Sequence, residues 1–462
     1  MQTAQTPAEE SLGHGDVDDA LRMAESAPSD DQRAARVAAV AHGAHGRWPQ
    51  AIERALAADD PHLANLAGAL SGAPVSAPAS VATDAVGAAA RGMASAVAAL
   101  QAGRDPIPDA LAAAALLDGR DDAQIFESPH VMVSMWAAEM LEANAMALRT
   151  ARRGVEEQPG GALLAGRHHL ALAWVTIVGG TWDQTPDERA NGKPVAARDA
   201  LLAAAIDAAA ALRVGEVDAL GRRLDDALSA LDRCGADAVT VSAVAEVVAV
   251  AVRLDRSDDV RRARDAAERI LDALGRPPLL VWALAWRLVR AGGLLGDAVV
   301  VGEACKAMEE SGPPSDKSEC LLHAAHTWLA IAEGSVDPEA VFAASRRLED
   351  AGLRWEAALL LGSAGVRTDD PAAARSLLSK AREIRRILPE LHAARGEVAG
   401  SLLTFRERDV AALVVDGLTH KEIGARLHVS AKTVEHHVAR IRQKLGASTR
   451  AEMLSGLREI LP

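Results

Sequence analysis

Apolar residues recur along almost the whole chain at the spacing of helices that are buried on one face. In the stretches 260–274 and 372–387 aliphatic residues return every three or four positions, the 3.6-residue period of an α-helix. No convincing series of alternating apolar and polar residues indicates strands. The pattern therefore predicts an all-α protein from about residue 13 onward, and residues 1–12, which are mostly polar, are predicted to be disordered.

Turn residues divide this helical part into segments. Glycine and proline clusters predict breaks at residues 71–78, 158–161, 181–194, 275–278 and 311–315. Helix starts, each an acidic residue or proline before an alanine-rich run, recur at residues 16–20, 49–51, 258–260, 296–298, 337–340 and 370–372.

The last four of these starts are separated by 33 to 40 residues. Paired helices at that period predict an α-solenoid similar to tetratricopeptide repeats over residues 13–395. A non-repetitive helical domain is the alternative, because the strict tetratricopeptide pattern is absent.

The last sixty residues contain the densest helix signals. Thr404, Thr419 and Thr449 each stand three residues before a glutamate, which is the form of a capping box. Gly417 and Gly446 stand where helices should end, because glycine accepts the left-handed conformation after a last turn. These signals predict four short helices, at about 405–416, 420–427, 431–445 and 450–459.

The third of these helices has one apolar and one polar face. Its apolar stripe consists of Val434, Val438, Ile441 and Leu445. The opposite face consists of Lys432, His436, Ala439, Arg440 and Gln443, with Glu435 and His437 at its flanks. A short helix, a sharp turn and a second helix with an exposed polar face make a helix-turn-helix, whose second helix enters the major groove of DNA.

This segment resembles the LuxR/GerE-type DNA-binding domain of bacterial transcription regulators. The matching motifs are Leu403-Thr404-x-Arg406-Glu407, Gly417-Leu418-Thr419-x-Lys421-Glu422-Ile423, Leu427-x-Val429-Ser430, Thr433-Val434-Glu435-x-His437 and Lys444-Leu445-Gly446. The resemblance implies a four-helix domain over 403–462, after a linker at 396–402, whose third helix reads the major groove and whose fourth supports dimer contacts. His420 and Gly424 depart from the usual Asn and Ala, and Gly424 weakens a short helix by up to about 1 kcal/mol.

Roles for single residues follow from their chemistry and from the resemblance. Cationic side chains in this set can meet phosphates, a glutamate can accept from cytosine N4, and an alanine can contact a thymine methyl. The predicted DNA-binding residues are Lys421, Lys432 and Arg440 for phosphates, Thr433 and His437 for the backbone, Glu435, His436 and Ala439 for base edges, and Gln443. The alternative is that these are only solvated residues of an amphipathic helix.

The charge distribution supports this division of the chain. The net charge is −14, yet residues 401–462 contain ten Lys or Arg and seven acidic residues, which gives +3 there and −17 elsewhere. An acidic body repels DNA and restricts its contact to the basic segment. The modest +3 predicts that one copy binds weakly and that a homodimer is needed.

Composition excludes several classes of protein. Three Phe and no Tyr argue against β-rich folds and against single-strand nucleic-acid grooves, which stack bases on aromatic rings. Three cysteines without CxxC spacing predict neither a disulfide framework nor a zinc site. The most apolar window, 236–254, is interrupted by charged residues and predicts a buried helix, not a membrane span. We predict a cytoplasmic, nucleoid-associated protein without a membrane segment.

No enzyme or cofactor motif is apparent. Helical repeats before this DNA-binding domain resemble the C-terminal half of large ATP-dependent LuxR-type regulators, but Gly192-Lys193-Pro194 lacks the glycine and hydroxyl that a phosphate-binding P-loop needs. His42 and His45 have no cluster to complete a metal shell, and Trp282 and Trp286 are interpreted as core anchors in preference to a ligand cage.

The sequence thus predicts a sequence-specific transcriptional regulator that is not an enzyme and needs no cofactor. Its partners would be double-stranded DNA, a second copy of the chain, and a protein, peptide or small-molecule effector at the helical region. The alternative is a helical-repeat interaction scaffold in which DNA binding is residual.

Overall fold

A computed structural model describes most of the chain and forms two compact units, residues 1–390 (unit 1) and 391–462 (unit 2). The described residues are 5–75, 82, 84–140, 144–178, 194–214, 217–313, 315, 318–387, 410–411, 413–415, 418–426, 434–435, 438, 441–442, 447, 452–454 and 457. Within these ranges all regular structure is α-helical and there is no strand, which confirms the predicted fold class. The predicted domain limits stay predictions.

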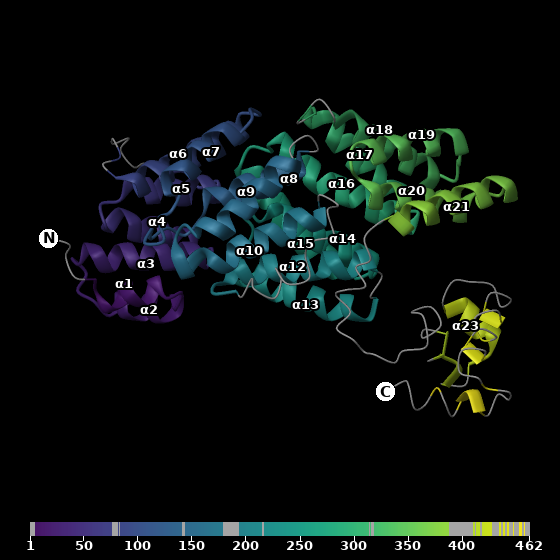
Figure 1. The fold of residues 1–462 in the computed structure, drawn as a ribbon, viewed down its shortest axis with the longest axis horizontal. Coiled ribbons are helices and arrows are strands. Elements are labelled where there is room, and N and C mark those ends of the chain that lie inside the picture. The colour runs from purple at the N-terminus through teal and green to yellow at the C-terminus, as the bar shows by residue number, and fades with distance from the viewer. Residues whose placement is uncertain are drawn as a thin grey trace. The chain divides into compact units, whose positions relative to one another are not determined.

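Unit 1 is built from helices that follow one another along the chain (Figure 1). They are α1 (Pro7–Gly13), α2 (Val17–Glu25), α3 (Gln32–Ala44), α4 (Trp48–Ala57), α5 (Pro61–Ser71), α6 (Ala85–Gln101), α7 (Ile107–Leu117), α8 (Pro129–Glu139), α9 (Asn144–Glu157), α10 (Gly161–Val178), α12 (Ala197–Val214), α13 (Val217–Cys234), α14 (Val241–Arg253), α15 (Ser257–Ala273), α16 (Pro278–Leu295), α17 (Ala298–Ser311), α18 (Ser318–Ala332), α19 (Pro338–Asp350), α20 (Arg354–Arg367) and α21 (Pro371–Ile387).

Each helix packs on its neighbours in sequence, and many also touch the helix two positions away, such as α12 with α14 and α14 with α16. This is the contact pattern of stacked helix pairs in a solenoid. The helices α15, α17, α19 and α21 begin 33 to 41 residues apart, close to the predicted period. A specific likeness to tetratricopeptide repeats stays a prediction.

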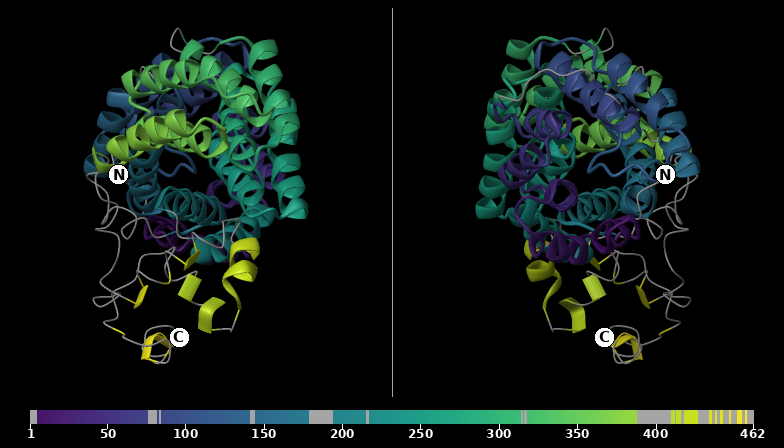
Figure 2. Two further views of the ribbon diagram at one scale, coloured as in Figure 1. Left: turned by 90° about the vertical axis from the view of Figure 1, so that its right-hand side faces the viewer. Right: turned by 90° about the vertical axis from the view of Figure 1, so that its left-hand side faces the viewer.

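The array also contacts itself over long sequence distances. Helix α1 touches α10, and α8 touches α16. Seen end-on, the helices of unit 1 run around a ring (Figure 2). Helices eight or nine positions apart are therefore brought together, and unit 1 is more than a chain of nearest-neighbour contacts.

Helix α1 corrects one expectation, because residues 7–12 were predicted to be disordered. Thr6 and Glu9 form a capping box, in which Glu9 N donates to Thr6 Oγ1 at 3.3 Å and Thr6 N donates to Glu9 Oε2 at 2.7 Å. Ala8 and Leu12 are buried, so the helix is held by packing as well as by its cap. The polar composition of the segment hid this short amphipathic helix.

The predicted helix starts are confirmed where the structure describes them. Asp297 caps α17 by accepting from Val300 N at 3.1 Å, and Asp337 caps α19 by accepting from Glu339 N at 3.0 Å. The predicted breaks at 158–161, 275–278 and 311–315 fall between helices. The break at 181–194 lies outside the described residues except for residue 194.

Helix α14 lies in the core of unit 1. Every residue of α14 from Val241 to Val252 is buried, which confirms the buried helix predicted at 236–254.

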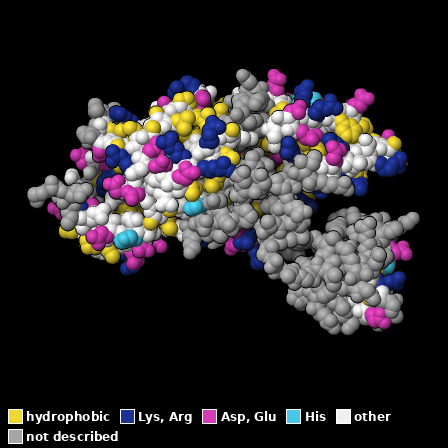
Figure 3. Space-filling model, viewed as in Figure 1, with side chains coloured by type: hydrophobic (Ala, Val, Ile, Leu, Met, Phe, Trp, Pro, Cys, Tyr) yellow, Lys and Arg dark blue, Asp and Glu magenta, His cyan; other side chains and the backbone are white. Residues whose placement is uncertain are grey.

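Helices α10 and α16 are long and apolar enough to cross a membrane, but 67% and 83% of their residues are buried inside the unit, as in the core helices of soluble proteins. Acidic and basic side chains alternate over the visible face of unit 1 (Figure 3).

Unit 2 has its own small core, to which all four predicted helices contribute. Its buried residues are Val410, Ala411, Val414, Ile423, Val434, Ile441, Met453 and Leu457. Only α23 (His420–Arg426) is described throughout, close to the predicted 420–427. The described residues at 410–415, 434–442 and 452–457 are helical, in agreement with the other three predictions.

Two backbone hydrogen bonds in unit 2 mark helix ends. Leu418 N donates to Leu413 O, and Ala447 N donates to Arg442 O, both at 3.0 Å. A bond across five residues is the outer bond of a Schellman motif, in which the residue before the donor takes the left-handed position. Both bonds therefore lie where the predicted stops require them, although the two glycines themselves are outside the described residues.

Candidate nucleic-acid interface

The start of α23 is fixed by the predicted capping box. Thr419 N and Thr419 Oγ1 both donate to Glu422 Oε2 at 2.7 Å, and Glu422 N donates to Thr419 Oγ1 at 3.3 Å. The backbone hydrogen bond from Thr419 is the main reason that the pKa of Glu422 lies below its ordinary value. Ile423 is buried while Lys421 is exposed, so this helix turns one face to the core and one cation to solvent.

The third predicted helix presents the expected stripe to the core. Val434 and Ile441 are buried and Val438 is half-buried, whereas Glu435 and Arg442 are exposed. The fourth member of the stripe, Leu445, lies outside the described residues. The 4- and 3-residue spacings therefore identified the inward face correctly, as a 3.6-residue period requires.

Of the nine predicted DNA-binding residues, Lys421 and Glu435 are described, and both side chains are exposed. Exposure is what contact with DNA requires of them, but it does not assign a role. The other seven lie outside the described residues: Lys432, Thr433, His436, His437, Ala439, Arg440 and Gln443.

Arg442 is an exposed cation on this helix that the sequence analysis did not select. It follows Glu435 by seven residues, or nearly two full turns, so the two side chains share one flank of the helix. A count of every charged residue outside the apolar stripe, including those beside it, would have found Arg442.

Comparison with known proteins gives this segment a family. Residues 401–455 match the model of bacterial regulatory proteins of the luxR family. The spore germination protein GerE of Bacillus subtilis is 47% identical over 51 residues, which cover 11% of this chain and 69% of that protein.

Longer regulators share only a short segment with this chain. A putative HTH-type transcriptional regulator of Mycobacterium bovis is 44% identical over 52 residues, which cover 11% of this chain and 6% of that protein. The transcriptional regulatory protein LiaR of Bacillus subtilis is 36% identical over 61 residues, 13% of this chain and 29% of that protein. The aligned part is thus a small fraction of these longer relatives.

The comparison and the described geometry agree. The match includes the capped α23 and the helix whose Val434 and Ile441 are buried, and the alignment covers 69% of a short relative, GerE. The chain belongs to the luxR family of bacterial regulatory proteins.

Proposed function

We propose that this protein is a sequence-specific, DNA-binding transcriptional regulator whose helix at 431–445 enters the major groove. The family match over residues 401–455 carries the proposal. The described geometry supports it, because Val434 and Ile441 are buried while Glu435 and Arg442 of the same helix are exposed. Because a bacterial transcription regulator must reach the chromosome, we propose that the protein is cytoplasmic and associated with the nucleoid.

The proposed contacts divide into two kinds. Phosphate contacts position the helix without reading sequence, whereas contacts to base edges read it. The residues proposed for phosphates and backbone positioning are Lys421, Lys432, Thr433, His437, Arg440 and Gln443, and those for base edges are Glu435, His436 and Ala439.

A homodimer and control by unit 1 complete the proposal. Residues 401–462 have a net charge of only +3, so two copies on adjacent half-sites would supply the affinity that one copy lacks. Unit 1 would set DNA occupancy through the geometry of the dimer or by masking residues 432–443, in response to a protein, peptide or small-molecule effector.

The test is selection of duplexes from a randomised pool by the full chain, followed by binding titrations at several salt concentrations. We expect one enriched sequence. A Lys432→Ala/Arg440→Ala double variant should bind all duplexes more weakly. In the proposed homodimer it removes two phosphate contacts per copy, so the salt slope should fall by about 3.6, at about 0.9 per contact. Glu435→Ala should instead relax the preference at one base position.

The matched control replaces two exposed basic residues of unit 1, Lys306 and Arg261, by alanine. This variant should bind like the parent. Failure to enrich any sequence, or equal losses in both double variants, would refute the DNA-reading surface.

An interaction scaffold with residual DNA binding is the second candidate, favoured by the extent of the helical array in unit 1. It predicts that the full chain binds selected DNA no better than the Lys432→Ala/Arg440→Ala variant does. No motif supports an enzyme, and we propose none.

A further inference from the structure

Unit 1 contains a pocket at the meeting point of several helices. The volume that a water-sized group can occupy is about 40 Å³, and the wider mouth, which includes open solvent, brings the empty space to about 550 Å³. Side chains from α8, α10, α12, α14, α16, α18 and α20 line it. The junction of several packed helices is a common location of small-molecule sites in proteins.

Three arginines and three glutamates line this pocket, and the side chains of all six are buried. Arg213, Arg287 and Arg290 all donate to the same oxygen, Oε1 of Glu246, at 3.3, 3.2 and 2.9 Å. Arg287 also pairs with Glu139 and Arg290 with Glu356. The side chains are at most 8% exposed, so these charges are desolvated at a cost that a purely apolar core would avoid.

Aromatic and aliphatic side chains form the remaining wall. The guanidinium carbons of Arg213 and Arg290 lie 4.9 and 5.3 Å from the ring centroid of Trp355, within cation–π range. Trp282 and Trp286 line the pocket together with Leu321 and other aliphatic residues. Both tryptophans are buried, as predicted for core anchors, and both also border the pocket.

The polar groups of the pocket are incompletely paired. Arg290 Nε and Glu246 Oε2 are buried without a hydrogen-bond partner. Arg290 makes two hydrogen bonds to glutamates, at 2.9 and 3.3 Å, although a guanidinium has five donors. Burial is the main cause that lowers the pKa of Arg290, although the carboxylates of Glu246 and Glu356 act to raise it.

We propose that this pocket binds a small organic acid, whose carboxylate pairs with Arg290 and whose apolar, planar body packs on the wall that includes Trp282 and Trp286. A carboxylate supplies the acceptor that the unpartnered guanidinium donor lacks. A neutral amide of the same shape offers that donor only an uncharged and therefore weaker acceptor, and an ammonium offers it none.

The proposal that this pocket binds a ligand is independent of DNA binding and is tested without DNA. Only the further step, that the ligand regulates DNA binding, rests on the proposed function. A ligand here touches α14, α16 and α20 at once, so it changes how one part of the array packs on another. That coupling would let a small molecule act as the effector.

The test uses the full chain and three probes of one shape: phenylacetate, 2-phenylacetamide and phenethylamine. Binding is measured by calorimetry and by tryptophan fluorescence up to millimolar concentrations. We expect saturable binding of phenylacetate, at least tenfold tighter than that of the amide or the amine. Tryptophan fluorescence should change with phenylacetate alone, because Trp282 and Trp286 line the site and Trp355 contacts the guanidinium of Arg290.

Two variants locate the binding. Arg290→Gln removes the proposed partner of the carboxylate, and Ala283→Leu reduces the space while it keeps all six charges. Each should weaken phenylacetate binding at least tenfold, and Arg264→Gln, at an exposed position, should not. If Arg290→Gln fails to fold, Ala283→Leu still decides. The proposal would be overturned if phenylacetate showed no saturable binding or if the three probes bound equally well. It would also be overturned if the folded variants bound phenylacetate as tightly as the parent.

Discussion

Arg287 and Glu139 pair through two hydrogen bonds although 148 residues of chain separate them. Arg287 Nη1 donates to Glu139 Oε2 at 2.6 Å and Nη2 donates to Oε1 at 2.8 Å, which is the two-pronged geometry of a strong arginine–carboxylate pair. The pair joins α8 to α16, two helices that are far apart in sequence. It is one of the bonds that hold the array in its coiled form.

Removing this arginine should destabilise unit 1. Arg287→Met takes away the arginine that pairs with the buried carboxylate of Glu139 and one of the three arginines around Glu246, for which we expect a loss of about 3–5 kcal/mol. The measurement is urea unfolding followed by tryptophan fluorescence, which reports unit 1 because all eight tryptophans precede residue 391. Arg264→Met, which removes an exposed pair with Glu303, should cost less than about 1 kcal/mol. Equal losses would contradict the role of the buried pair.

Gly293 should tolerate no side chain. A Cβ at this position of α16 would lie 2.3 Å from Cε3 of Trp328, a fully buried ring, so Gly293→Ala should destabilise the protein by about 1–3 kcal/mol through overpacking. Gly362→Ala in α20 is the control, because nothing lies within 4 Å of its Cβ. There the gain in helix propensity should stabilise by up to about 1 kcal/mol. Thermal melting of both variants would show opposite shifts.

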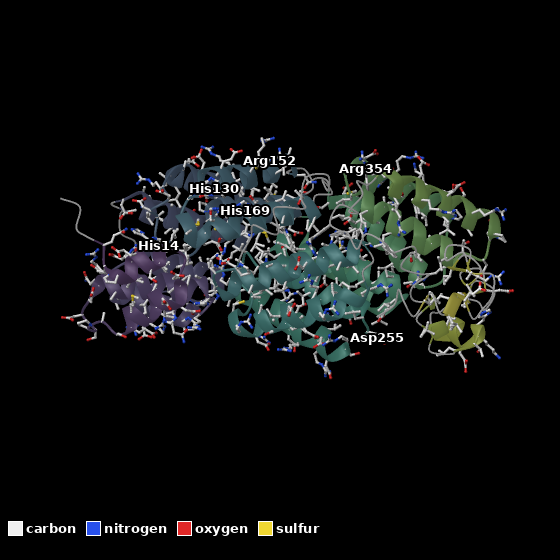
Figure 4. All side chains as sticks on the ribbon, turned by 60° about the horizontal axis from the view of Figure 1, so that its bottom comes forward. His14, His130, Arg152, His169, Asp255 and Arg354 are labelled. Carbon is white, nitrogen blue, oxygen red and sulfur yellow. The ribbon has the colours of Figure 1, made fainter. Side chains whose placement is uncertain are left out.

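His168 should make unit 1 sensitive to acid. Burial is the main cause that lowers the pKa of His168 to about 3, and its Nε2 lies 2.8 Å from Ser128 Oγ. Its neighbour His169, on the same helix α10, and His130 on α8 are marked in Figure 4. Between pH 6.5 and 3 the unfolded chain binds a proton that the folded chain does not, so stability is present above pH 6.5 and falls as the pH is lowered.

Each such histidine contributes up to about 1.4 kcal/mol per pH unit to this loss. His168→Gln should therefore reduce the drop in the urea midpoint between pH 6.5 and about 5. His326→Gln, at an exposed position, is the control and should leave the drop unchanged. A drop as steep in His168→Gln as in the parent would show that other groups cause it.

The capping box should govern the opening of α23. Thr419→Ala removes the hydroxyl that accepts from Glu422 N and donates to its carboxylate, at a cost of about 1 kcal/mol. That cost corresponds to roughly fivefold faster hydrogen exchange in a peptide covering 418–426. Thr419→Ser keeps the hydroxyl and should exchange like the parent. Exchange that is equal in all three proteins would mean that packing of Ile423 alone fixes the helix.

Local signals predicted much of this structure. Helix starts at Asp297 and Asp337, the stripe of Val434, Val438 and Ile441, and the capping box at Thr419 were all visible in the sequence, because each depends on residues a few positions apart. The family match confirmed the resemblance that the spaced motifs indicated.

Long-range relationships could not be predicted in the same way. Nothing in the sequence connects Glu139 to Arg287, or Glu246 to three arginines on two other helices, since the pairing depends on how far the array coils per helix. The same reason hid the pocket beside Trp282 and Trp286. Of the candidate DNA surface, Lys421 and Glu435 are described, and the assignment of the rest still depends on the family resemblance.

The contact between α1 and α10 affects how the protein is made. About 150 residues separate the two helices, and a ribosome that adds about 5–20 residues per second needs roughly 7–30 s to cover them. During that interval α10 has not yet been synthesised. The apolar surface of α1 that packs on α10 in the folded protein is therefore exposed to solvent. Early translation is thus the period in which chaperones would meet this protein.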